Sequence, residues 1–309
     1  MDLALRRLLV VVLGAVAVMT FAGFLLKAQC VGHYNELRDK NLCSNDIQVL
    51  YSIRGLQDRP FPYINGELVD GQLVGGALEY PVLTGLFAWF PSLVVETDGG
   101  YLQATALLLA PFSFITAWLL LKMVRWRALI YAGAPPLVWY SFHNWDLLVV
   151  CATVAAFYTW WQRRYAWAGC WVAVGSCLKL WPVFLVLPLL LDRLAVADRD
   201  GARRAMASFA SVFILANAGF LIASPRGWWS PIQFQRERAA DITSNSIWYW
   251  GYDGFTTDQL NVVVAFLLIA GSTAAAAYGW HRAKREGVYP FLQVSGACLA
   301  LFMLTNKAH

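Results

Sequence analysis

A series of long apolar runs is the feature that most constrains this chain. The clearest runs are residues 8–26, 101–121, 145–161, 205–223 and 259–280, and weaker ones are 127–142, 165–179, 181–191 and 289–305. A helix needs about 20 mostly apolar residues to cross the hydrocarbon core of a bilayer. Only 14% of the residues are charged, against roughly 25% in soluble domains. The sequence therefore predicts an all-α polytopic membrane protein with about nine transmembrane helices, and it excludes a secreted soluble domain, a basic nucleic-acid-binding protein and a disordered tail.

The placement of basic residues predicts which side of the membrane each loop faces. Lys and Arg gather in short segments outside the runs, at 6–7, 122–127, 163–164, 192–204 and 281–286. All of these segments fall on one side if the apolar run 80–95 does not cross, and basic loops are retained on the cytoplasmic side. We therefore expect 80–95 to form a surface-lying or half-inserted helix. The N-terminus is then cytoplasmic, the last residue is extracytoplasmic, and the net charge of +5 requires no acidic partner.

One integral-membrane domain is expected to cover residues 1–309. Its parts are a first span at 8–26, an extracytoplasmic loop at 28–100 with surface helices, spans within 101–223, a second extracytoplasmic loop at 224–258 and further spans within 259–305. The first run has no small-residue cleavage site after it, so we interpret it as a signal anchor. Within the first loop, residues 44–55 are expected to form a short amphipathic helix that Ser44 or Asn45 caps.

Ionisable side chains from five hydrophobic elements are expected to converge on the outer side of the membrane. They are Asp46, Glu79, His143, Asp146, Lys179, Lys307 and His309. Each lies at a helix end or in a loop, so an interfacial anchor is the alternative interpretation for any single one of them. Their convergence favours a polar cavity that opens at the outer leaflet.

Asp46 and the two lysines suit different parts of one reaction. A carboxylate at Asp46 is suited to act as general base on a hydroxyl group, and the alternative is a charge that complements the helix dipole. Lys179 and Lys307 are suited to hold a phosphate or pyrophosphate. His309 is a further candidate donor for the same anion.

The cysteines, histidines and tryptophans indicate structure more than chemistry. Cys30 and Cys43 lie 13 positions apart on the expected oxidising side, which favours a disulfide that braces the Asp46 loop. The His and Cys spacing does not match a zinc site, and no Gly-x-x-x-x-Gly-Lys loop is present, so we expect no cofactor and no metal. An aromatic cluster is interpreted as an interfacial belt, with stacking on a sugar or isoprenoid chain as the alternative. It comprises Trp228, Trp229, Trp248, Tyr249 and Trp250.

Six segments resemble glycosyltransferase family 87 in their order along the chain. They are CSNDIQVLYSIRGL, LEYPVLTGLF, HNWDLLVV, CLKLWPVFLVLPLLL, FQRERAADITSNSIWYW and LTNKAH. This family belongs to the GT-C membrane enzymes and includes polyprenol-phosphate-mannose-dependent mannosyltransferases. The resemblance extends from about Cys43 to the last residue. Its members usually continue with further spans after the Asn-Lys motif, so we expect this chain to be a fragment of a longer protein.

The resemblance implies a role for each matching residue. Asp46 takes the place of the acidic general base in the first extracytoplasmic loop, and the helix after Glu79 and Tyr80 resembles the juxtamembrane helices of the GT-C fold. The residues implied in the substrate pocket are Glu79, Tyr80, Asn144, Asp146, Arg238, Asp241 and Trp248. Those implied to grip the donor phosphate are Lys179, Lys307 and His309.

The function that follows is inverting sugar transfer on the extracytoplasmic face. The resemblance implies a polyprenyl-phosphate donor with mannose as the expected sugar, and a glycolipid or polysaccharide acceptor. Arabinofuranose transfer is an alternative within the same family. Two other classes remain open, namely a transporter or flippase for a lipid-linked sugar and a scaffold subunit without chemistry. All of these readings place the chain among membrane lipids and none involves nucleic acid.

Overall fold

The computed structural model describes residues 3–38, 40–239, 247–251 and 254–306, and it is almost entirely helical in these ranges. Its longer helices are α1 (Leu3–Ala28), α5 (Asp98–Val124), α8 (Asp146–Trp161), α9 (Tyr165–Leu178), α11 (Arg199–Ala223), α12 (Pro225–Glu237), α14 (Thr257–Glu286) and α15 (Phe291–Thr305). The shorter ones are α2 (Tyr34–Leu37), α3 (Asp46–Ile53), α4 (Val82–Ser92), α6 (Ala128–Ala132), α7 (Pro135–Tyr140), α10 (Val186–Ala195) and α13 (Ile247–Gly251). Three 3₁₀ turns, Leu56–Asp58, Arg125–Arg127 and Trp181–Leu185, complete the helical segments.

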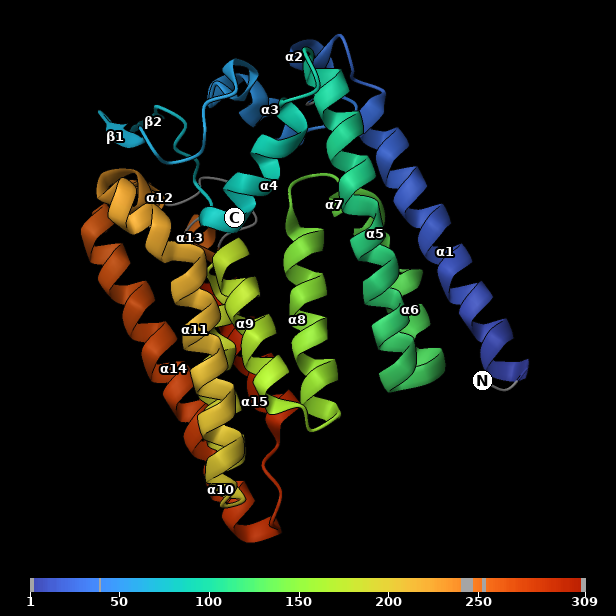
Figure 1. The fold of residues 1–309 in the computed structure, drawn as a ribbon, viewed down its shortest axis with the longest axis vertical. Helices are drawn as coiled ribbons and strands as arrows, with labels where there is room; N and C mark the ends of the chain where they lie inside the picture. Colours follow the sequence, from blue (N-terminus) through green and yellow to red (C-terminus); the bar gives the residue numbers. More distant parts are fainter. Residues whose placement is uncertain (1–2, 39, 240–246, 252–253, 307–309) are drawn as a thin grey trace.

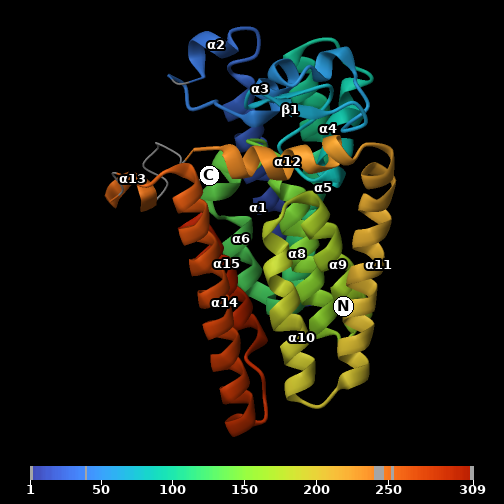
Figure 2. The ribbon, with the colours of Figure 1, turned by 90° about the vertical axis from the view of Figure 1, so that its left-hand side faces the viewer.

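The long helices run side by side along one axis, and the long loops gather at one end of the bundle (Figure 1). That end carries α2, α3 and α4, while α12 lies across it (Figure 2). The opposite end carries the turns between α8 and α9, α10 and α11, and α14 and α15. Three of the five basic segments that the sequence assigns to one side, 163–164, 192–204 and 281–286, lie in or next to these turns.

Four helical segments are long and apolar enough to cross a membrane, counting within the described ranges. They are Leu3–Ala28, Asp98–Ala132, Arg199–Ala223 and Thr257–Glu286. Large aliphatic side chains on their outer faces are strongly exposed, among them Leu215, Ile222 and Val262, as expected for surfaces that contact lipid. The prediction of an all-α membrane protein is confirmed at this level. The number of about nine crossings stays a prediction, since α8, α9 and α15 fall short of this length.

The run at 80–95 forms the short helix α4. Its 11 residues extend about 16 Å at 1.5 Å per residue, roughly half of the 30 Å hydrocarbon core. A helix of this length does not cross a bilayer alone. The helix begins at Val82. Pro81 comes directly before it, has an extended backbone and has no N–H group to donate.

The prediction of a capped helix near Asp46 is confirmed. Helix α3 begins at Asp46, and the side chain of Asn45 accepts a hydrogen bond from the backbone N–H of Gln48. Asn45, not Ser44, is therefore the cap. Ile47, Leu50 and Tyr51 are buried on one face of this helix, as the amphipathic pattern requires.

A small β-hairpin in the first loop departs from the all-helical expectation. Strands β1 (Glu67–Val69) and β2 (Gln72–Val74) pair in antiparallel register. The turn between them is Asp70-Gly71, and both residues have positive φ, 48° and 75°. Asp-Gly is a preferred pair for such a two-residue turn. The sequence therefore contains a hairpin signal that lies outside the apolar runs.

A buried ion pair joins three helices at the end opposite the long loops. The Asp192 side chain on α10 is 2% exposed. It accepts a hydrogen bond of 2.7 Å from Trp160 Nε1 of α8 and forms an ion pair of 2.7 Å with Arg193. The Arg193 guanidinium also lies 4.1 Å from the ring centroid of Tyr165 on α9. The contacts of Asp192 and Arg193 therefore hold α8, α9 and α10 together.

Replacing Asp192 by Ala is expected to lower the free energy of unfolding by about 3 kcal/mol, because Arg193 is left partly uncompensated in a buried site. Asp198, 3.4 Å from Arg193, limits the loss. Thermal unfolding in detergent micelles measures the effect. The matched control is Asp200→Ala, which removes the largely exposed partner of Arg203 and is expected to change little. Equal losses in the two variants would contradict the structural role of Asp192.

Candidate active site

Asp46 is held at the start of α3 by the loop between α7 and α8. Its backbone N–H donates a hydrogen bond of 2.7 Å to the carbonyl of His143. Its carboxylate is partly exposed and accepts a hydrogen bond of 3.0 Å from the hydroxyl of Tyr80. Both the backbone and the side chain of Asp46 are thus positioned by segments far away in the sequence.

Tyr80 orients the Asp46 carboxylate as a neutral donor. The residue is 9% exposed and packs edge-on against Trp145, with the ring centroids 5.4 Å apart. Burial raises the pKa of Tyr80 well above its usual value, and the carboxylates of Asp46, Glu79 and Asp146 raise it further. The phenol therefore keeps its proton at physiological pH and donates it to the hydrogen bond with Asp46.

An ion pair between Lys179 and Asp146 lies beside Tyr80. Lys179 follows α9, Asp146 begins α8, and the ammonium donates directly to the carboxylate. The Lys179 Nζ atom lies 5.8 Å from the ring centroid of Tyr80. The side chain of Asn144 accepts a hydrogen bond of 2.9 Å from the backbone N–H of Asp146. Since Lys179 already has a carboxylate partner, an anionic ligand at this place would share the ammonium with Asp146.

These contacts join five residues that the sequence assigned to the site. Asp46, Tyr80, Asn144, Asp146 and Lys179 form one continuous group, which we call the Asp46 cluster. Trp145 lies within it, and its buried indole N–H has no acceptor among the described residues. A buried donor without an acceptor is uncommon and costs free energy, so the cluster is polar but incompletely hydrogen-bonded.

Glu79 has a different partner from the members of this cluster. Its carboxylate pairs with Arg54 at 2.9 Å, and both side chains are largely buried. Arg54 in turn lies 5.3 Å from the ring centroid of Phe234 on α12. The structure thus places Glu79 as a link between the end of α3 and α12, whereas the sequence placed it in the substrate pocket.

The remaining predicted site residues lie elsewhere or outside the described ranges. Arg238 is an exposed residue that ends α12. Trp248 belongs to α13, and its indole donates to the carbonyl of Thr305 at 3.0 Å. Asp241, Lys307 and His309 lie outside the described residues. Of the predicted phosphate ligands, only Lys179 is therefore placed.

An apolar cavity begins next to the Asp46 cluster and extends between α5, α8 and α9. Its volume is about 360 Å³. Leu148 and Leu178 line it and are close neighbours in sequence of Asp146 and Lys179. Trp118 on α5 and Tyr158 on α8 line it further along the bundle. This apolar crevice therefore reaches the start of α8 and the end of α9, where Asp146 and Lys179 lie, although neither residue lines it.

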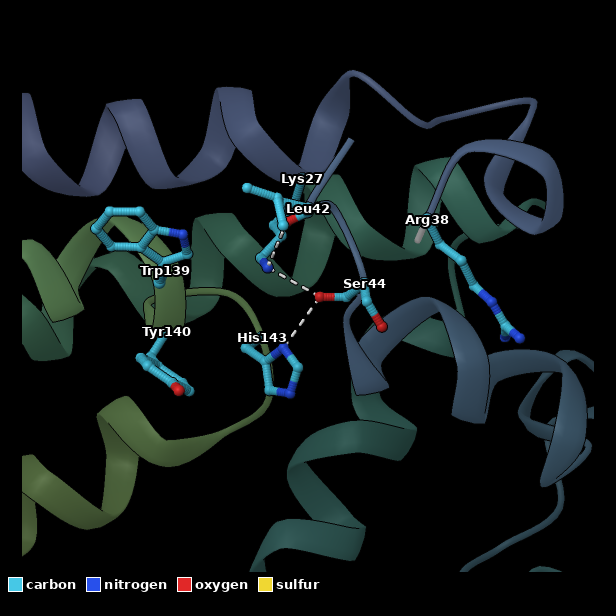
Figure 3. A pocket seen from close by; sticks show the side chains of 7 residues that line it. All are labelled: Lys27, Arg38, Leu42, Ser44, Trp139, Tyr140 and His143. Carbon is cyan, nitrogen blue, oxygen red and sulfur yellow. Dashed lines mark hydrogen bonds between the residues drawn. The ribbon is translucent and has the colours of Figure 1, made fainter. Parts of the chain in front are cut away.

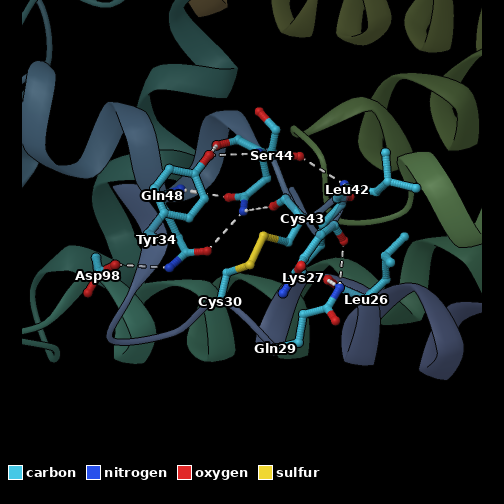
Figure 4. Close-up of a disulfide and its surroundings, with 12 residues drawn as sticks. Leu26, Lys27, Gln29, Cys30, Tyr34, Leu42, Cys43, Ser44, Gln48 and Asp98 are labelled. Atoms are coloured by element: carbon cyan, nitrogen blue, oxygen red, sulfur yellow. Dashed lines mark hydrogen bonds between the residues drawn. A yellow bond between two sulfur atoms is a disulfide. The ribbon is translucent and has the colours of Figure 1, made fainter. Parts of the chain in front are cut away.

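The disulfide between Cys30 and Cys43 closes the loop that leads to Asp46 (Figure 4). Next to it, the Tyr34 hydroxyl donates to the carbonyl of Asn45 and accepts from its N–H, both at 2.8 Å. Gln48 donates to the Asp98 carboxylate at 2.9 Å, which ties α3 to α5. The start of α3 is therefore anchored to its neighbours from several sides.

Replacing Cys30 and Cys43 together by Ser is expected to lower the free energy of unfolding by about 3 kcal/mol, as a chain-entropy estimate gives for a loop of this length. The measurement is thermal unfolding in detergent without reductant. The control is Cys170→Ser, since Cys170 is a partly exposed free thiol on α9. The prediction fails if the double variant unfolds at the same temperature as this control.

The arrangement provides a base, a cation and an apolar passage in one place. The carboxylate of Asp46 is oriented and accessible, and Lys179 supplies positive charge nearby. Within the described residues, no group of three His, Cys, Asp or Glu side chains is arranged to hold a metal ion, and metal dependence stays untested. Asp46 is suited to remove a proton from a hydroxyl group. Lys179 is suited to bind an anion nearby, and the crevice is suited to hold an apolar chain that the anion carries.

A comparison with protein families identifies the family of the chain. The profile of glycosyltransferase family 87 matches residues 78–305, which is well over half of the 309 residues. The match covers Tyr80, Asn144, Asp146 and Lys179, and it begins after Asp46. No curated protein and no solved structure gives a significant match. The chain belongs to glycosyltransferase family 87.

Proposed function

We propose that this membrane glycosyltransferase moves a sugar from a polyprenyl-phosphate donor to a glycolipid or polysaccharide acceptor on the extracytoplasmic face. Mannose is the first expected sugar and arabinofuranose is the alternative. The observation that supports the proposal most is the position of the Asp46 carboxylate. It is oriented by a neutral Tyr80 beside Lys179, at the end of the bundle that the apolar crevice between α5, α8 and α9 reaches.

In the proposed reaction, Asp46 acts as general base. It accepts the proton of the acceptor hydroxyl while the hydroxyl oxygen forms a bond to the anomeric carbon of the donor sugar. The bond between that carbon and the phosphate oxygen breaks, and the polyprenyl phosphate leaves with its negative charge. The attack and the departure occur on opposite faces of the sugar, so the anomeric configuration inverts.

The crevice and the cations supply the two ends of the donor site. An isoprenoid chain is apolar and fits the lining of the crevice between α5, α8 and α9. The donor phosphate would then lie at its mouth, where Lys179 shares its charge with Asp146. Lys307 and His309 remain proposed ligands for the same phosphate. Positive charge at this point stabilises the departing phosphate.

Sugar transfer in reconstituted membranes tests the proposal. The protein is incorporated into proteoliposomes with a cell-envelope lipid extract and radiolabelled polyprenyl-phosphate mannose, followed by the arabinose analogue. We expect label to move into a larger glycolipid or polysaccharide with one of the two donors. Movement of the intact donor across the bilayer, without transfer of label, would contradict the proposal and indicate a flippase.

A further inference from the structure

A second cavity, of about 320 Å³, lies beside the segment that precedes α3 (Figure 3). It is bounded by the end of α1, the segment before α3, and the end of α7 with the loop that follows. The residues that line it and bear on its chemistry are Lys27, Arg38, Ser44, Trp139, Tyr140 and His143. It shares no lining residue with the crevice, and neither Asp146 nor Lys179 lines it, so it is a separate cavity.

Lys27 gives this cavity a buried positive charge. The residue is 2% exposed, and its ammonium donates to the backbone carbonyl of Ser44 at 2.8 Å and to that of Leu42 at 3.5 Å. Within the described part of the chain, no acidic side chain forms an ion pair with it. An ammonium has three N–H donors, and two carbonyls leave one donor for a ligand.

His143 approaches the same carbonyl from the opposite wall. Its Nδ1 atom lies 3.0 Å from the carbonyl oxygen of Ser44. Because a carbonyl oxygen only accepts, we assign a proton to Nδ1, and Nε2 then donates to an anion only in the doubly protonated ring. The ring also packs edge-on against Tyr140, with centroids 5.8 Å apart. One carbonyl thus fixes the positions of both the ammonium and the imidazole.

The lining selects an anion that belongs to a lipid. Lys27 supplies positive charge, and no Asp or Glu is among the described residues that line the cavity. Two half-exposed aromatic residues, Trp139 and Tyr140, form the adjoining wall at the end of α7. Trp and Tyr in such positions are typical of the level of lipid head groups. A phosphate matches the donors, and the aromatic wall favours one that is carried on a membrane lipid.

The position of the cavity relative to Asp46 distinguishes acceptor from donor. Ser44 lies two residues before Asp46, and the carbonyl of His143 accepts the Asp46 N–H. The crevice suited to the donor chain lies instead beside Asp146 and Lys179. One donor phosphate does not occupy both places. We propose that the cavity of Lys27 and His143 binds the phosphate of the acceptor lipid, an inference that rests on the proposed function.

Binding measured without sugar transfer tests this inference. The probes are dioctanoyl phosphatidic acid, dioctanoyl phosphatidylglycerol, inorganic phosphate and decaprenyl phosphate, each titrated into the full chain in a zwitterionic detergent. Lys27→Gln removes the charge and keeps a donor for the Ser44 carbonyl, and His143→Gln changes the opposite wall. Lys40→Gln is the control, since it removes an exposed lysine from the same loop.

We expect a phospholipid probe to bind the unmodified chain, with its Kd raised at least about tenfold by each cavity variant and unchanged by Lys40→Gln. Decaprenyl phosphate should bind all of these proteins equally. If the cavity variants bind both phospholipids with the same Kd as the unmodified chain, the proposed site is wrong. A Kd for decaprenyl phosphate that rises in the cavity variants overturns the acceptor assignment in favour of the donor. Inorganic phosphate that binds as tightly as the phospholipids overturns the lipid part of the proposal.

The design separates this inference from the proposed function. If sugar transfer fails while phospholipid binding still depends on Lys27, the binding site is supported and the transferase mechanism is contradicted. Formation of the disulfide between Cys30 and Cys43 checks that the Lys27→Gln variant has folded around the cavity, because Lys27 contacts the segment next to Cys43. His143→Gln provides the second measurement if Lys27→Gln does not fold.

Discussion

Replacing Asp46 by Asn is expected to lower the rate of sugar transfer by roughly 10²–10⁴-fold, the usual contribution of a general base. The amide side chain has nearly the same shape as the carboxylate but does not accept a proton at physiological pH. Its oxygen still accepts the hydrogen bond from Tyr80, and the backbone bond to His143 does not depend on the side chain. The variant should therefore fold and bind the donor as the unmodified chain does.

The transfer assay with radiolabelled donor measures this effect, and donor binding is measured in parallel. The matched control is Asp98→Asn. Asp98 is also a partly exposed acidic residue in the first turn of a helix, and it accepts a hydrogen bond from Gln48 of α3, which Asn preserves. The control should retain nearly full activity. Equal rates in Asp46→Asn and the unmodified protein would remove Asp46 as the base and leave the family assignment intact.

Features that depend on a few neighbouring residues, or on the composition of one segment, were predictable from the sequence. The helix near Asp46 follows from an Asn cap and an apolar face, and both features lie within a few residues of each other. The disulfide pair followed from spacing and the expected oxidising side, and the structure has the same pair. The apolar runs predict the helices because burial in lipid depends on composition over about 20 residues.

The partners of side chains across the fold were less predictable. Glu79 and Tyr80 are adjacent in sequence, yet one side chain pairs with Arg54 and the other with Asp46. Which way each turns depends on the packing of α3 and α12, which no local pattern contains. Lys27 was likewise overlooked, since a lysine at the end of an apolar run usually extends to the membrane surface. Only the fold brings the carbonyl of Ser44 to it.

The convergence of polar groups at one end of the bundle was deduced from charge and chain direction, and the structure refines it. Five of the predicted residues meet in the Asp46 cluster, where Lys179 already pairs with Asp146. A phosphate at that place therefore meets a cation whose charge is partly neutralised. Besides Lys307 and His309, which remain proposed phosphate ligands, the apolar crevice is the part of the described site that can contribute binding free energy for the proposed donor.

Replacing Ala155 by Trp is expected to weaken the use of a long-chain donor. Ala155 lines the crevice on α8 and is buried, so an indole at this position fills space that we assign to the isoprenoid chain. Burial contributes about 0.8 kcal/mol per CH₂ group, and the loss of contact with even one isoprene unit therefore lowers the affinity about tenfold or more. We expect kcat/KM for decaprenyl-phosphate mannose to fall by at least that factor, mainly through KM.

A donor with a short chain separates loss of the crevice from loss of the fold. Geranyl-phosphate mannose reaches less of the crevice than the decaprenyl donor, so its kcat/KM should change much less in Ala155→Trp. Ala270→Trp is the matched control, because Ala270 is exposed on α14 and the same side chain there leaves the crevice open. If both donors lose activity equally in Ala155→Trp, the substitution has damaged the Asp46 cluster itself. If instead neither donor loses activity, the donor chain lies along another surface, since a chain bound in this crevice must respond to a side chain that fills it.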